Sequence, residues 1–217
     1  ALLDLVSAHE VQGRVVFPGA GYLEMARAAS AACADEASAL QGVFFLQPLV
    51  ITANTLHIEC AVADDRFEVR SSEDVTYDGA VVHCSGAVSV GSGGHRVDQA
   101  LLRGPLHAAD VDALYNGLYD LGLQYGPKYR TLTHTWGAAR HALGRVSVVP
   151  THDRMVQVHP AALDDALCTS AAMGSSVGSG KTRLPFAVDH ALLQGAPGEL
   201  WTVRFPACTF SFPLCSL

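Results

Sequence analysis

Three short patterns hold the side chains that are best suited to chemistry. The first, HxxxGxxxxP, runs from His9 through Gly13 to Pro18. The second is Gly-Leu-Gln-Tyr-Gly-Pro-Lys-Tyr over 122–129, and the third is His-Pro-Ala-Ala-Leu-Asp over 159–164. An imidazole titrates near neutral pH and can accept a proton, and a carboxyl kept neutral by apolar neighbours can donate one. The residue types therefore point to proton transfer.

Taken singly, these residues also have structural interpretations. A lone histidine near a chain terminus, such as His9, is usually a surface residue, and Asp164 alone would be a helix acid favoured by the helix dipole. The next residue, Asp165, lies about 100° further around the helix and is expected to be such an acid. Tyr-Gly-Pro at 125–127 alone would be a turn. The functional interpretation depends on finding all three patterns together.

Two further motifs fail on their context. A P-loop ending in Gly180, Lys181 and Thr182 would need glycine at position 175, which is serine. Residues 174–178 match GxSxG, but that nucleophile elbow joins a strand to a helix, and here it follows a predicted helix. We therefore expect a loop over 174–180. The ten histidines are scattered without HExxH, so no metal site is expected.

Composition excludes several classes of protein. The 217 residues, 49% of them hydrophobic, are enough to bury a core. The net charge is −7, from 14 Lys+Arg and 21 Asp+Glu, which argues against binding to nucleic acid or to an anionic membrane surface. We find no apolar run long enough to span a membrane and no signal-peptide pattern.

The six cysteines are widely spaced and include no CxxC pair. This spacing favours neither a zinc ribbon nor a small disulfide scaffold. Reduced thiols in a cytoplasmic protein are the simplest interpretation.

Hydrophobic periodicity predicts the elements that must position the three patterns. Helices are expected over 22–34, 111–121 and 160–173. Strands are expected over 13–17, 43–49, 54–62, 66–71, 80–90, 130–136, 142–149, 184–193 and 199–205, and a turn over 122–127.

The glycine-rich segment 91–95 is the clearest linker. It divides the chain into residues 1–95, with His9, and residues 96–217, with Asp164. Each part has an Ala-rich helix and several strands, which predicts an α+β fold with a duplicated architecture.

The three ordered patterns together strongly resemble the dehydratase domains of modular polyketide synthases. That family carries HxxxGxxxxP, GYxYGPxF and HPxxxD motifs in the same order. The runs 13–24 and 184–186 are also typical of it. The resemblance covers nearly the whole chain and implies a double hot dog fold, in which two long helices are each wrapped by an antiparallel β-sheet.

The resemblance also implies an activity. The family's members are hydro-lyases that remove water from a 3-hydroxyacyl thioester to give a 2-enoyl thioester. His9 would take the proton from C2, and Asp164 would protonate the departing hydroxyl. Backbone N–H groups near Gly13, or after Pro18, would stabilise the charge on the thioester oxygen.

The second motif would complete the site. Tyr125 would line it, Gly126 would help to shape the site, and Pro127, together with Pro18 of the first motif, would shape the backbone. No metal or redox cofactor is implied, because the substrate is carried on the phosphopantetheine of an acyl carrier protein. The expected partners are that carrier protein, neighbouring synthase domains and, in a homodimer, a second copy.

The sequence departs from the family at three positions. Cys168 stands where the family has Gln or His, four residues after Asp164 and on the same helix face. Leu123 replaces a common Tyr, and Ala8 replaces a common Asp before His9. Because a thiol is a weak hydrogen-bond partner, several alternatives stay open: a slower dehydratase, a related isomerase or oxygen-heterocycle-forming cyclase, and an inactive scaffolding domain.

The last stretch, 205–217, does not look like the family's closing strands, since it has no charged residue and holds two of the six cysteines. We therefore expect a truncated or divergent C-terminus, which would leave a sheet edge exposed in the second hot dog.

Overall fold

The Ala-rich segment after Pro18 forms helix α2 (Gly19–Cys33), which begins before the predicted start at residue 22. The sequence analysis left residues 18–21 between the strand predicted over 13–17 and the helix. The structure shows why Gly21 belongs to the helix: a Cβ at this position would lie 2.6 Å from Cε1 of Phe17. The glycine therefore allows the Phe17 ring to pack against the first turn.

The structure is a computed structural model that describes residues 5–33, 38–52, 56–90, 106–138, 142–147, 156–169, 187–191, 193 and 200–204. The predicted linker 91–95, the loop 174–180, the run 184–186 and the stretch 205–217 lie outside the described residues.

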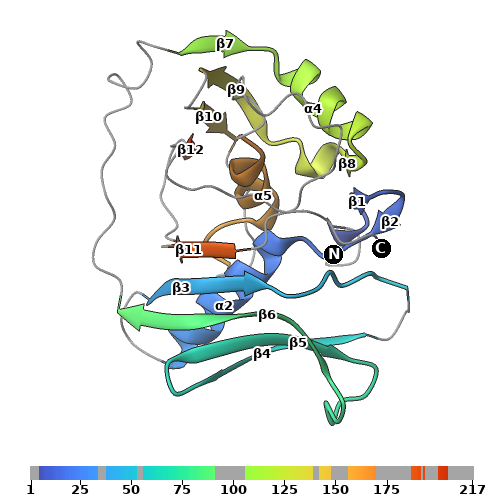
Figure 1. Ribbon diagram of the computed structural model, residues 1–217, viewed down its shortest axis with the longest axis vertical. Coiled ribbons are helices and arrows are strands. Elements are labelled where there is room, and N and C mark those ends of the chain that lie inside the picture. The colour runs from blue at the N-terminus through green and yellow to red at the C-terminus, as the bar shows by residue number, and fades with distance from the viewer. Residues whose placement is uncertain are drawn as a thin grey trace.

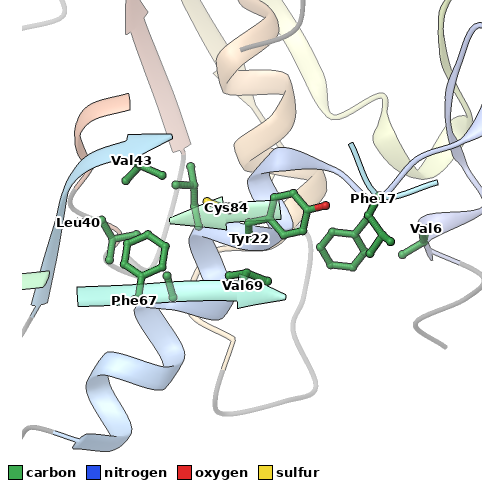
Figure 2. Packing of buried hydrophobic residues seen from close by; sticks show 11 residues of the cluster. Val6, Phe17, Tyr22, Leu40, Val43, Phe67, Val69 and Cys84 are labelled. Carbon is green, nitrogen blue, oxygen red and sulfur yellow. The ribbon is translucent and has the colours of Figure 1, made fainter. Parts of the chain in front are cut away.

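Helix α2 lies across a five-stranded antiparallel sheet with the order β11-β3-β6-β5-β4 (Figure 1). Its strands are β3 (Ser38–Phe45), β4 (His57–Ala63), β5 (Arg66–Ser72), β6 (Val81–Val90) and β11 (Ala187–Ala191). The core between helix and sheet is apolar, and Figure 2 shows Tyr22 of α2 beside Phe17, with Phe67, Val69 and Cys84 on the sheet side. Burial of this apolar surface is the main stabilisation of this half.

Strand β3 begins at Ser38, before the predicted strand 43–49. The prediction starts too late because the strand contains a bulge. Its pairing with β6 shifts between Gln41 and Phe44, and Gly42 between them has a φ of +52°. The bulge interrupts the alternation of apolar and polar residues on which the sequence prediction depends. The predicted strand therefore starts only after it.

The other half holds two smaller sheets. One has the order β12-β10-β9-β7 and the other β2-β1-β8. The strands are β1 (His9–Val11), β2 (Arg14–Val15), β7 (His107–Ala109), β8 (Leu123–Tyr125), β9 (Leu132–Gly137), β10 (Ala142–Val146) and β12 (Leu200–Arg204).

Two helices and a short 3₁₀ helix complete this half. Helix α4 (Val111–Asp120) confirms the helix predicted over 111–121. Asp110 caps it, because its carboxylate accepts hydrogen bonds from the backbone N–H groups of Asp112 and Ala113. Helix α5 (Pro160–Cys168) lies beside the four-stranded sheet and contacts α2 (Figure 1). The 3₁₀ helix η1 spans Pro127–Tyr129.

Two strand pairings cross the predicted division at residue 95. Strand β11 pairs with β3, and β8 pairs with β1. The division into 1–95 and 96–217 stays a prediction, but sheets join residues from both sides of it. Among the described residues, no helix combines the length and apolarity needed to cross a membrane.

Candidate active site

Strand pairing brings the first and second sequence motifs together. His9 of β1 lies directly opposite Tyr125 of β8 in the antiparallel register. The sequence analysis assigned 122–127 to a turn, which is wrong for β8. A three-residue strand is too short to show a period of its own, and its pairing partner lies more than a hundred residues away.

The glycine and proline of the second motif hold this pairing. The N–H of Gly126 donates to the carbonyl of Ala8 at 2.8 Å. A Cβ on Gly126 would lie 3.0 Å from Cβ of Ala8, so only glycine fits without displacement. Pro127 then begins η1, where its fixed φ suits the first helical position. Gly126 and Pro127 thus fix the backbone next to His9, and their part in the site stays a prediction.

Gly13 lies in the exposed turn between β1 and β2, with a φ of +73°. The positive φ accounts for glycine here. Pro18 is buried immediately before α2, and its carbonyl accepts a hydrogen bond from Gly21 at 2.9 Å. The expected close approach of Gly13 to substrate and the expected shaping role of Pro18 both stay predictions.

Helix α5 brings the third motif to His9. His159 caps the helix, with Nδ1 accepting from the N–H of Ala161, and Pro160 occupies the first position. Asp164 then faces His9, with 3.8 Å between Oδ2 of the carboxyl and Nε2 of the imidazole. Both residues are almost fully buried, with exposed fractions of 5% for His9 and 7% for Asp164.

The hydrogen bonds of His9 fix which ring nitrogen carries a proton in the neutral imidazole. Nδ1 lies 2.7 Å from the carbonyl oxygen of Val16. A carbonyl oxygen only accepts, so Nδ1 must be the donor. Nε2 then has a free lone pair, and it is the nitrogen that faces Asp164.

Asp164 lies in an environment that favours its neutral form. Burial raises its pKa, while attraction to His9 and a hydrogen bond from Tyr125 oppose the rise. Its Oδ2 has no hydrogen-bond partner among the described residues, although it is buried. A buried carboxyl oxygen without a partner, next to an imidazole lone pair, is an arrangement suited to a ligand with its own polar groups.

Cys168 lies at this site, as the helix spacing predicts. Its Sγ is 3.2 Å from the hydroxyl of Tyr125, and burial together with the nearby Asp164 raises the pKa of the thiol well above its ordinary value. The same causes raise the pKa of Tyr125. Both groups therefore stay protonated at neutral pH, which does not suit a nucleophilic cysteine.

The sequence analysis assigned no role in the site to two residues that lie there. Tyr129 is fully buried, and its ring centroid lies 5.3 Å from that of His9. Its position two residues after Pro127, in the second motif, was the available signal. The ring centroid of Tyr125 is 5.5 Å from that of His9, so two tyrosine rings pack against the imidazole.

The second missed residue is Asp165, for which the expectation of a helix acid near the first turn is wrong. Helix α5 starts at Pro160, so Asp165 lies beyond the first turn, and it is fully buried. Its carboxyl accepts hydrogen bonds from Thr131 and Tyr115. Neither the burial nor these distant partners leave a signal in the local sequence.

The residues that the structure describes include no group of three or more His, Cys, Asp or Glu side chains arranged to hold a metal ion.

Comparison with known proteins identifies the family. Residues 3–74 match a family model described as polyketide synthase dehydratase domain. Residues 95–204, half of the chain, match one described as polyketide synthase dehydratase N-terminal domain. The chain belongs to the polyketide synthase dehydratase family. The family predicted from the three motifs is thereby confirmed, and dehydratases of this kind are hydro-lyases.

Curated relatives are much longer proteins. Polyketide synthase ThaG of Burkholderia thailandensis is 34% identical over 172 residues, which cover 73% of this chain and 3% of that protein. Polyketide synthase PksN of Bacillus subtilis is 27% identical over 215 residues, covering 89% of this chain and 4% of that protein. The dehydratase chain thus spans only a few per cent of these relatives.

Solved structures of dehydratase domains confirm the predicted double hot dog fold. The dehydratase domain from the CurF module of curacin polyketide synthase matches with a TM-score of 0.81 and 24% identity, covering 95% of this chain and 80% of that one. GphF dehydratase 1 matches with a TM-score of 0.77 and 24% identity, covering 93% and 76%.

Proposed function

We propose that this dehydratase domain removes water from a 3-hydroxyacyl thioester, with His9 as the base and Asp164 as the acid. The observation that carries the proposal is the buried pair itself. An imidazole lone pair on Nε2 faces an unpartnered carboxyl oxygen at 3.8 Å. Two groups at this separation can reach substituents on adjacent carbon atoms of one bound substrate.

The proposed reaction balances within this pair. Nε2 of His9 takes the proton from C2, and the electrons of the C–H bond form the C2=C3 double bond. The C3–O bond breaks, and the hydroxyl leaves as water with the proton of Asp164. An imidazolium and a carboxylate then remain 3.8 Å apart, so a proton return from His9 to Asp164 resets the site.

The environment of each group suits its proposed role. The raised pKa of Asp164 keeps the carboxyl protonated to higher pH than in water, as a general acid requires. Tyr125 donates to that carboxyl and orients it. The N–H groups of Gly19 and Ala20, at the start of α2, are proposed donors to the thioester oxygen, because the first N–H groups of a helix have no acceptor within it. The N–H of Gly21 already donates to the carbonyl of Pro18.

The proposed substrate is the acyl chain on the phosphopantetheine arm of an acyl carrier protein, and no other cofactor is required. Neighbouring synthase domains and a second copy of the chain are the further partners proposed, and the cytoplasm is the proposed location. The two curated relatives described above support a place within a synthase, since both are named as polyketide synthases.

The test is turnover of a 3-hydroxyacyl N-acetylcysteamine thioester, followed by mass spectrometry for the loss of one water. His9→Phe and Asp164→Asn should each lower the rate by at least ~10²-fold, the usual contribution of a positioned acid or base. The structurally similar CurK dehydratase is described as inactive both as a histidine-to-phenylalanine and as an aspartate-to-asparagine variant.

The matched controls are His134→Phe and Asp120→Asn, which change the same residue types at exposed positions of β9 and α4. Both should keep the wild-type rate. Full activity of His9→Phe would contradict the proposal. Conversion of a 2-enoyl thioester with a distal hydroxyl into a chromatographically distinct isomer of the same mass would instead favour an isomerase or cyclase.

A further inference from the structure

One carboxylate oxygen of Asp165, the residue after the proposed acid, accepts four hydrogen bonds. Oδ2 of Asp165 accepts from the hydroxyl of Thr131 at 2.6 Å and from the hydroxyl of Tyr115 at 2.8 Å. The backbone N–H groups of Thr131 and Leu132 donate to the same oxygen. Hydrogen bonds to a charged, buried acceptor are the stronger kind, so this carboxylate is a firm anchor for α5.

Three of these four donors, two from Thr131 and one from Leu132, belong to the segment that also positions the base, and the fourth, Tyr115, lies in α4. Strand β8 ends at Tyr125, directly opposite His9. The chain continues through η1, whose Tyr129 packs on the imidazole, and reaches Thr131 two residues later. Asp165 therefore ties the helix that carries the acid to the segment that holds the base.

We propose that Asp165 is a positioning residue that holds Asp164 at its working distance from His9. The inference rests on the proposed function, because the working distance matters only if the two groups act together. The two aspartates are consecutive and project about 100° apart around α5. A hold on Asp165 consequently fixes the rotation of the helix that aims Asp164.

A second anchor holds the start of the same helix but does not set its rotation. The buried carboxylate of Glu24 in α2 pairs with Arg27 and accepts from the backbone N–H of Gln157 at 2.7 Å. That contact lies before His159, the helix cap. It holds the entering chain, and the Asp165 contacts then determine which way the helix faces.

The first experiment removes one hydroxyl donor to Asp165 at a time, with substitutions that leave no large cavity in the core. Thr131→Val replaces the hydroxyl by a methyl group, and Tyr115→Phe removes one oxygen. Each should lower kcat by roughly 10-fold or more and change KM by less than about 2-fold, since a misplacement of about 1 Å can cost up to ~10²-fold in rate. The matched control is Thr135→Val, a buried threonine of the same region whose hydroxyl donates to the carbonyl of Leu143.

The second experiment tests whether a conservative substitution of Asp165 restores the kcat that an alanine substitution removes. Asp165→Ala removes the acceptor and should reduce kcat as strongly as the donor variants together. Asp165→Asn keeps an oxygen that Thr131 and Tyr115 can donate to, so it should recover most of the lost kcat. Should Asp165→Ala not fold, the Thr131→Val and Thr135→Val comparison decides the question.

The inference is overturned if Thr131→Val lowers kcat no more than Thr135→Val, or if KM rises as much as kcat falls. Failure of the wild type to dehydrate any thioester would instead overturn the proposed function. The crystal structure of Thr131→Val then decides the positioning role. A His9–Asp164 separation that stays at 3.8 Å refutes it, and a separation longer by about 1 Å supports it.

Discussion

Replacing Asp165 by asparagine should change how the stability of the chain depends on pH. Burial raises the pKa of Asp165 from its ordinary value of 3.8 to about 6, although the hydrogen bonds from Thr131 and Tyr115 oppose the rise. The folded state therefore binds more protons than the unfolded state between these two values. The contribution of Asp165 to the free energy of unfolding is therefore fully present below pH 3.8, and it is lost as the pH rises through about 6.

The size of the effect follows from the two pKa values. Each pKa unit corresponds to about 1.4 kcal/mol, so a rise from 3.8 to about 6 corresponds to roughly 3 kcal/mol. The free energy of unfolding of the wild type should therefore fall by roughly 3 kcal/mol, on account of Asp165 alone, between about pH 3.5 and about pH 7. Asp165→Asn has no proton to lose, so its free energy of unfolding should gain about 3 kcal/mol relative to the wild type over the same range.

Urea unfolding followed by far-ultraviolet circular dichroism at a series of pH values measures this difference. The new amide group of the variant is itself buried without a partner, which lowers stability by an amount that does not change with pH. Thr135→Val keeps Asp165 and should give a curve parallel to that of the wild type. A constant difference between Asp165→Asn and wild type from pH 3.5 to 7 would refute the reasoning.

Three further predictions concern the site and the core. Gly126→Ala should lower stability by about 1–3 kcal/mol in thermal unfolding, because its Cβ meets Ala8, and turnover should fall as β1 is displaced. Cys168→Ala should keep turnover within about 3-fold of wild type, because the thiol gives only a weak hydrogen bond to Tyr125; complete loss would show that the thiol takes part in the chemistry. Phe67→Ala should cost about 3–5 kcal/mol in urea unfolding, because the ring is fully buried against α2, and a cost below about 1 kcal/mol would contradict the assigned core.

The motifs predicted that His9 and Asp164 lie in one site, but not how the fold brings them together. Residue type and order are local properties, and they placed His9 and Asp164 in one site of a recognisable family. The pairing of β1 with β8 leaves almost no sequence signal, because each strand has three residues and therefore about one repeat of a two-residue period. Longer strands such as β5 and β6 alternate over enough residues to be predicted closely.

The charged residue Asp165 in an apolar helix was the other source of error. Composition and helix periodicity treat a charge as a mark of the exposed face. Glu24 and Arg27 are nevertheless buried in α2, where they pair with each other, and Asp165 is buried against Thr131. Their partners are fixed by tertiary packing, which a local pattern does not contain.

The pairing of β11 with β3 has a consequence for synthesis of the chain. When the ribosome has completed β3 to β6, the strand that pairs with the outer edge of β3 is still missing, because β11 follows about a hundred residues later. At the usual ~5–20 residues per second, this edge stays unpaired for several seconds or more. An open edge invites pairing with other nascent chains. Slower translation between these strands should therefore raise aggregation, even though every contact of the finished fold is unchanged.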